Sequence, residues 1–158
     1  MDFCQSSGWL HEQADFPEML RFIMQRGSPG HWSGIALSVA SCLPPQEAFD
    51  VLVRALHGTD IGQTANISQA IAHTKHPDAE ATLRRHLVAV WAHPALWEDA
   101  DFVNWVGFDA TTCIAHLIEA GAPPSDFTNE VRRLSEHVCS HNRQCCRNFL
   151  SKHYSWFK

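Results

Sequence analysis

The sequence predicts an all-α protein, an α-solenoid of about three stacked helical hairpins with an N-terminal capping helix and a C-terminal closing helix. The first observation is an internal repeat: the segment 36–56 matches the chain again 31 residues later, and that copy matches once more 47 residues further on. The second is that matched positions stay apolar, as in Ala36, Ile67 and Ile114; Val39, Ala70 and Leu117; Leu56, Leu87 and Leu134. Helical hairpins that bury their apolar faces against one another produce such a period.

Composition is the third observation, and it predicts one domain over residues 1–158. Of the 158 residues, 45% are hydrophobic and 18% are charged, which is a globular composition. A net charge of −5 with no long run of Lys or Arg does not favour nucleic acid or an anionic membrane as a partner. With no apolar run of roughly 20 residues and no signal-like N-terminus, we expect a cytoplasmic protein with no membrane partner and with reduced cysteines.

The N-terminal cap, residues 1–30, contains one predicted helix. Asp15 can cap this helix, Pro17 suits its first turn, and Glu18 follows three positions after Asp15 as in a capping box. The glycines and the proline that follow Arg26 would end it.

Repeats one and two span residues 31–92. We expect helices over 31–41 and 46–56 in the first repeat, and over 62–73 and 78–92 in the second. The turns between them contain proline, which interrupts a helix but suits the first turn of the next one.

The distance from the second copy to the third is 16 residues longer than the first interval, which predicts an insertion over residues 93–109. Repeat three then occupies residues 110–140, with helices expected over 110–120 and 125–138. The closing helix lies within residues 141–158 and is expected over about 142–156.

The stretch 68–87 resembles a HEAT repeat of the short kind first named in phycobilisome lyases. The resemblance is carried by an alanine-rich first helix, a Pro-Asp turn and paired leucines, namely Ile71, Pro77, Asp78, Ala79, Leu83 and Leu87. The other two copies depart from the family pattern, since their turns are Pro-Pro and Glu130 replaces one leucine of the last copy. Over residues 31–140 the resemblance implies an α-solenoid used for binding, and it transfers no catalytic residue.

Tryptophans and acidic residues gather in and beside the insertion, and they are candidate partner-binding residues: Trp91, Trp97, Glu98, Asp99, Asp101 and Trp105. Insertions between repeats lie on one face, and tryptophans among acidic groups would suit a basic, partly apolar surface of another protein. The competing interpretation is a short packing helix built from Leu96, Phe102, Val103, Trp105 and Phe108.

Arginines recur on the predicted return helices, and they too are candidate partner-binding residues: Arg54, Arg84, Arg85, Arg132 and Arg133. Stacked repeats would arrange them in a row along one surface, usually the concave one, where guanidinium groups can hold an acidic partner or phosphates. The competing interpretation is that their long side chains cover apolar seams and pair with Asp or Glu of the next repeat.

His137, His141 and Cys145 are spaced four residues apart, which is a spacing that zinc ligands on one helix face can have. On one continuous helix they could bind zinc with Glu136 as the fourth ligand. The residues around His141 instead predict a break between helices, so we expect no metal and no cofactor. The cysteines of this region are expected to pack as small apolar residues, namely Cys139, Cys145 and Cys146.

These patterns favour a non-catalytic protein that binds another protein through its concave face and its insertion. Small size and negative charge would suit an immunity protein that masks a basic toxin. The alternative is an enzyme or cofactor-handling protein, since some HEAT-like proteins are bilin lyases or DNA glycosylases; Asp99 or Asp101 would then be the candidate carboxylate. A Cys113–His116 pair is disfavoured as nucleophile and base by its apolar neighbours. The oligomeric state is not predicted.

Overall fold

The computed structural model describes residues 15–26, 29–97 and 105–157. These ranges contain helices and connecting turns and no strand, so the predicted all-α class is confirmed for them. The α-helices are α2 (Phe16–Arg26), α3 (Pro29–Cys42), α4 (Pro45–Gly58), α5 (Ala65–His73), α6 (Ala79–Ala92), α7 (Pro94–Trp97), α8 (Val106–Glu119), α9 (Thr128–Ser135) and α10 (Ser140–His153). Two short 3₁₀ helices are η1 (Pro124–Phe127) and η2 (Tyr154–Phe157).

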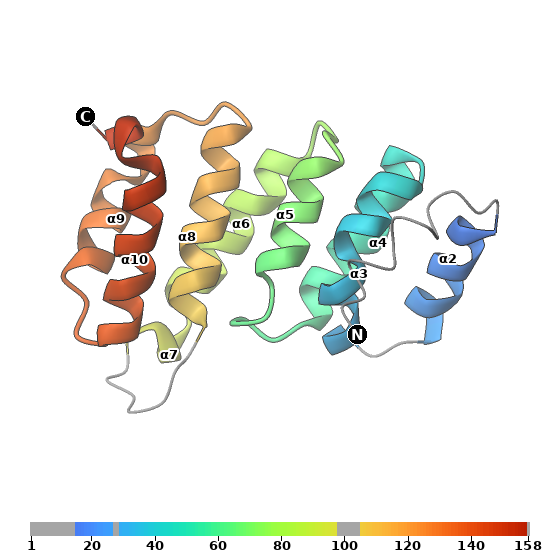
Figure 1. The fold of residues 1–158 in the computed structure, drawn as a ribbon, viewed down its shortest axis with the longest axis horizontal. Coiled ribbons are helices and arrows are strands. Elements are labelled where there is room, and N and C mark those ends of the chain that lie inside the picture. Colours follow the sequence, from blue (N-terminus) through green and yellow to red (C-terminus); the bar gives the residue numbers. More distant parts are fainter. Residues whose placement is uncertain (1–14, 27–28, 98–104, 158) are drawn as a thin grey trace.

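The helices form two rows (Figure 1). In the first row, α3, α5, α8 and α10 pack each on the next and run in the same direction. Helices α4, α6 and α9 return behind them in the opposite direction, and α2 packs on α3 at the N-terminal end of the rows. The second and third predicted hairpins are not closed units, because α6 packs more on α8 than on α5, and α9 packs mainly on α10. A solenoid of three stacked hairpins therefore stays a prediction.

The apolar residues that recur in the sequence form the core. All three members of each matched set are buried, namely Ala36, Ile67 and Ile114; Val39, Ala70 and Leu117; Leu56, Leu87 and Leu134. Full burial of a leucine or isoleucine side chain contributes about 2 kcal/mol to folding. The recurrence therefore reflects packing between helices.

The two rows differ in how closely their helices approach. Neighbours in the first row are in extensive contact, whereas α4, α6 and α9 make few contacts with one another. The side formed by the return helices is therefore grooved, and a hollow between α4 and α6 is lined by Arg84 and Arg85 together with Phe49 and Val53.

The first helix of the third predicted repeat begins earlier in the structure than expected. Helix α8 begins at Val106, four residues before the expected position, and its first turn contains the buried Asp109, which bonds to the backbone just before α5. Gly107 lets α10 approach, since a Cβ at this position would lie 2.3 Å from Oδ1 of Asn142. These long-range contacts extend α8 into the sequence that looked like an insertion.

The return helix expected over 125–138 is also shorter than predicted. It starts as the 3₁₀ helix η1, continues as α9 and ends at Ser135, and a turn then leads into α10 at Ser140. The predicted break between helices is therefore present a few residues earlier than expected. None of the helices in the described ranges has both the length and the hydropathy needed to cross a bilayer.

Candidate functional site

A groove of about 590 Å³ runs between α8 and α10 and reaches α5. Because α8 and α10 run in the same direction, their N-terminal ends lie together at one end of the groove and their C-terminal ends at the other (Figure 1). The wall between the ends combines the apolar side chains of Ala115 and Phe149 with polar ones, namely Gln69, Thr111, Thr112, Gln144 and Asn148. Concave surfaces that combine aromatic and polar side chains are the usual places for ligand binding.

Trp105 and Phe108 form the aromatic end of the groove. Their exposed fractions are 53% and 43%, and their rings meet edge to face with centroids 6.0 Å apart. The Trp105 ring also meets the ring of His141 edge to face at 5.2 Å, which links the start of α8 to the start of α10. Large aromatic side chains that remain exposed after folding are candidate contacts for a partner.

A second hollow, of about 300 Å³, shares Trp105 and Phe108 with the groove. It is also lined by the turn at Gly62 and by Ser33 and Asn66, whose side chains are hydrogen-bonded at 3.2 Å. The two aromatic residues therefore border two recesses at once, and one partner could contact both recesses while covering the rings.

A buried polar network holds the start of α8 against α5 and α6. Oδ2 of Asp109 accepts hydrogen bonds from the backbone N–H groups of Gly62 (2.7 Å) and Thr64 (3.0 Å) and from the Thr64 hydroxyl (2.5 Å). Since that hydroxyl donates its hydrogen to Asp109, Nε2 of His86, 2.9 Å away, has to donate to the Thr64 oxygen. Burial lowers the pKa of His86 although the Asp109 charge opposes the shift, so the imidazole is neutral at pH 7.

Titratable side chains gather at the C-terminal end of the groove. Nδ1 of His116 lies 2.9 Å from a carboxylate oxygen of Glu119, and Lys152 and His153 face them from α10. The His153 ring stacks on Trp156 with centroids 4.0 Å apart. Desolvation lowers the pKa of His153; Glu119 acts to raise it, while Lys152 and His116 lower it further. The groove thus has the exposed Trp105 and Phe108 rings at one end and the charged side chains of Glu119 and Lys152 at the other.

The thiols of Cys113, Cys145 and Cys146 do not suit nucleophilic catalysis. Cys113 is fully buried, its thiol donates to the carbonyl of Leu83 at 3.3 Å, and burial raises its pKa to about 12. Burial also raises the pKa of Cys146 to about 11 and that of Cys145 above its ordinary value. These thiols are protonated at neutral pH, and a protonated thiol is a poor nucleophile.

Trp91 and Trp97, predicted to bind a partner, lie together and away from Trp105. Their rings meet edge to face at 5.3 Å, and the indole N–H of Trp97 donates to the Trp91 carbonyl at 2.9 Å. The Arg133 guanidinium lies 4.3 Å from the centroid of Trp97, and His137 stacks on the same ring at 5.2 Å. Arg133 therefore covers the tryptophans of α6 and α7, and these three predicted residues form one cluster.

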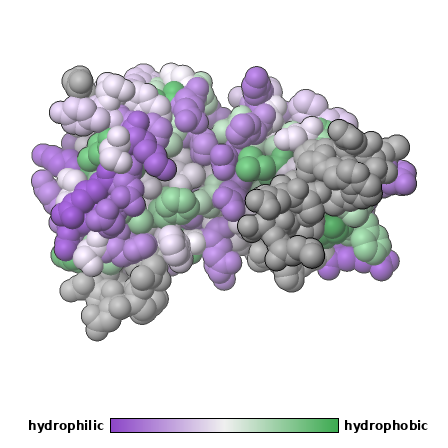
Figure 2. Space-filling view, viewed as in Figure 1, coloured by the Kyte–Doolittle hydropathy of each residue, from purple (hydrophilic) through white to green (hydrophobic). Residues whose placement is uncertain are grey.

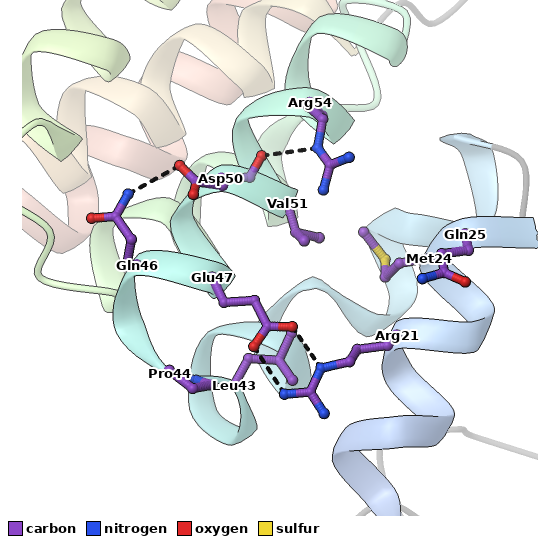
Figure 3. A pocket seen from close by; sticks show the side chains of 10 residues that line it. All are labelled: Arg21, Met24, Gln25, Leu43, Pro44, Gln46, Glu47, Asp50, Val51 and Arg54. Carbon is purple, nitrogen blue, oxygen red and sulfur yellow. Dashed lines mark hydrogen bonds and ion pairs between the residues drawn. The ribbon is translucent and has the colours of Figure 1, made fainter.

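Arg54 lines a different recess, a cleft of about 750 Å³ between α2 and α4 (Figure 3). Arg21 and Glu47 bridge this cleft through paired contacts of 2.6 and 2.9 Å. Met24 and Val51 point toward one another across it (Figure 3). The Arg21–Glu47 ion pair connects α2 to α4 across this cleft. The two arginines that line the cleft, Arg21 and Arg54, are balanced by two carboxylates, Glu47 and Asp50.

The remaining predicted arginines are engaged by their own neighbours. Arg84 pairs with Glu80 at 2.8 Å and with Asp126 at 3.0 Å, so it joins α6 to the turn before α9. Arg85 donates to the Thr82 hydroxyl and Arg132 to the Asn129 side chain, each at 3.3 Å. All five predicted arginines lie on return helices: Arg54 lines the cleft between α2 and α4, Arg84 and Arg85 share the hollow between α4 and α6, and Arg133 lies against Trp91 and Trp97.

The acidic candidates of the insertion, Glu98, Asp99 and Asp101, lie outside the described residues. In the described part of the chain, no group of three or more His, Cys, Asp or Glu side chains is arranged to hold a metal ion. The break between α9 and α10 separates His137 from the other two candidate zinc ligands. His137 stacks on Trp97, whereas Nε2 of His141 lies 3.6 Å from the sulfur of Cys145.

Among the residues that line the groove, sequence reasoning predicted only Trp105 as a partner contact; it named Phe108, His116, His141 and Cys145 for other roles. One available signal was the charge of α10, which carries Arg143, Arg147 and Lys152 and no acidic residue. Figure 2 shows hydrophilic side chains gathered over this helix. Comparisons with protein-family models, with curated proteins and with solved structures found no match for this chain.

Proposed function

We propose that this chain is a non-catalytic protein-interaction module, a HEAT-like α-solenoid that binds another protein across the face formed by α5, α8 and α10. The observation that carries the proposal is the exposed Trp105–Phe108 pair, which borders two recesses at once. Interface hot spots are typically aromatic side chains at the centre of a contact with polar groups around them.

The energetics are adequate for specific binding. Burying a large aromatic side chain against a partner contributes about 2 kcal/mol, and a few such residues usually supply most of the affinity of an interface. The start of α8 is held by the buried Asp109 network, so the two rings are presented by a rigid element. A rigid presentation reduces the entropy lost on binding.

The chemistry of the described residues supports binding over catalysis. The thiols of Cys113 and Cys146 are protonated, and His86 is neutral and buried. The groove is lined by three half-buried imidazoles, one exposed carboxylate and one exposed ammonium group, which are suited to recognition by charge and hydrogen bonding.

Toxin neutralisation is the narrower hypothesis, motivated by the compact size and the net charge of −5. It predicts a stoichiometric complex with a basic protein that survives high salt and weakens with Trp105→Ala. A purified chain that binds none of the toxins produced by its own host would exclude this narrower function while leaving the general proposal intact.

The general proposal is tested by site-directed photo-crosslinking in lysate of the native host. A benzoylphenylalanine in place of Thr112, inside the groove, should capture a discrete protein, whereas the same substitution at the exposed Val88 of α6 should not. Trp105→Ala should reduce this capture at least tenfold, and the control Phe22→Ala, which removes an exposed ring of α2, should not. Capture that is equal at both crosslinker positions, or unaffected by Trp105→Ala, would refute the proposal.

A further inference from the structure

We infer that the groove between α8 and α10 binds a short, extended acidic segment of the partner, with an apolar side chain at Trp105 and a carboxylate at Lys152 and His153. This inference rests on the proposed function and names the chemistry of the partner. Three features of the groove lead to it: its dimensions, its polar wall and the charges at its C-terminal end.

The dimensions fit a short extended peptide. His141 and Lys152 line opposite ends of the groove on the same helix, and their separation in sequence corresponds to roughly 16 Å along the helix axis. An extended chain covers this distance with about five residues. A volume of about 590 Å³ is small for a packed helix and sufficient for a single strand with small side chains.

The wall between the ends can satisfy a peptide backbone. The Gln144 side-chain N–H donates to the Asn148 side-chain carbonyl at 2.9 Å, which orients both amides. This bond uses one hydrogen of the Gln144 NH₂ group. The carbonyl oxygen and the second hydrogen of Gln144, together with the NH₂ group of Asn148, remain available to a ligand. Thr112 and Gln69 add a hydroxyl and a third amide from the opposite wall. A bound strand needs donors and acceptors of this kind, because its own N–H and C=O groups lose water.

The charges at the C-terminal end favour a carboxylate. Glu119 is the single acidic residue that lines the groove, and its carboxylate is paired with His116. Lys152 has no acidic partner in the described part of the chain. Helix α10 adds Arg143 and Arg147 outside the groove and has no acidic residue to offset them. A carboxylate that arrives here meets an ammonium group and two imidazoles, and contact with imidazolium strengthens as pH falls.

The groups that control this pH dependence come from both walls. His116 and Glu119 lie on α8, and Lys152 and His153 lie on α10. His116 and Glu119 also border a recess lined by His73, Lys75, His76 and Glu80, and His141 lines the opposite end of the groove. Desolvation lowers the pKa of His153, and a bound carboxylate would stabilise the protonated form of this imidazole, so binding should be tighter at pH 6 than at pH 8. The negative charge of Glu119 repels a bound carboxylate, so a substitution that removes this charge should tighten binding.

Fluorescein-labelled six-residue peptides test the inference by fluorescence anisotropy. The probes carry leucine or phenylalanine at the first position and aspartate or glutamate at the last, and matched probes carry asparagine or glutamine there with an amidated C-terminus. The acidic probes should bind about tenfold more tightly at pH 6, with a smaller difference at pH 8. Glu119→Gln should strengthen their binding, and Trp105→Ala should weaken binding of both series.

Charge reversal on α10 provides the matched control. Lys152→Glu should abolish the preference for acidic probes, and Arg147→Glu, which makes the same charge change outside the groove, should preserve it. An equal effect of the two variants, no preference between the probe series, or displacement of the probes by a single-stranded oligonucleotide at equal concentration would overturn the inference. Capture of a protein at Thr112 without acidic preference would refute this inference alone, whereas loss of that capture would refute the proposed function.

Discussion

One oxygen of Asp109, Oδ2, binds both the backbone N–H and the hydroxyl of Thr64, a residue 45 positions earlier in the chain. Asp109 belongs to the first turn of α8, and Thr64 immediately precedes α5. The pair therefore joins the starts of two adjacent first-row helices, beside the two recesses that Trp105 and Phe108 border.

Removal of this carboxylate should destabilise the protein strongly. Asp109→Ala leaves two backbone N–H groups and one hydroxyl without their acceptor at a buried site, which is expected to lower the free energy of unfolding by about 3–5 kcal/mol. Urea unfolding followed by circular dichroism measures the change. The control Asp126→Ala removes an exposed ion pair with Arg84 and should cost about 1 kcal/mol or less. Similar losses for the two variants would contradict the structural role of Asp109.

Gly107 should be intolerant of even a methyl group. In Gly107→Ala, the added Cβ would meet Oδ1 of Asn142 at 2.3 Å, and Asn142 is itself buried and bonded to the Leu96 carbonyl. The expected loss of unfolding free energy is about 1–3 kcal/mol. Gly34→Ala is the matched control: it lies within α3, its Cβ would meet nothing within 4 Å, and it should raise stability by up to about 1 kcal/mol.

A double-mutant cycle identifies the cause of the Gly107 effect. If the clash with Asn142 is responsible, then Gly107→Ala should cost less in the background of Asn142→Ala, giving a coupling of about 1 kcal/mol or more. Additive effects in the cycle would place the strain elsewhere.

Stability should depend on pH through His86. Burial lowers the pKa of this imidazole below 6.5, so the unfolded chain takes up a proton at a pH where the folded protein does not. Stability therefore decreases as pH falls below about 6.5 and towards the lowered pKa of the folded state. In His86→Gln, the plot of unfolding free energy against pH should be flatter between pH 5 and 7 than in the parent. Parallel curves for the two proteins would exclude His86 as a source of the acid sensitivity.

The thiols should react in the order of their burial. With a pKa near 12 and no exposed surface, Cys113 should resist iodoacetamide at pH 8 until the protein unfolds. Cys42 is only partly buried and should be alkylated first of these two. Peptide-level mass spectrometry after timed labelling measures both rates, and early modification of Cys113 in the native protein would contradict its buried position.

The helices and the core were accessible from the sequence because they depend on local periodicity. Leu52 and Leu83 occupy matched positions, and both are buried, as the helical pattern predicted. The ends of the helices were less accessible, since they depend on distant partners. The start of α8 is an example, because its position depends on contacts of Asp109 with the turn before α5 and of Gly107 with α10.

The candidate site illustrates the same limit. Trp97 and Trp105 are eight positions apart and were predicted to act on one surface, yet Trp97 lies under Arg133 of α9 while Trp105 is exposed beside His141 of α10. The sequence indicated tryptophans and arginines as candidate partner-binding residues, but it contains no information about which of these side chains contact one another.

The sequence by itself determined the helical class and the apolar positions that form the core, because hydrophobic periodicity acts over a few residues. Tertiary structure alone decided that Trp105, Phe108 and Lys152 line one groove and that Arg84 and Arg133 are engaged by neighbouring side chains. The physical reason is that a binding surface is formed by side chains brought together from different helices, and their proximity depends on how those helices pack.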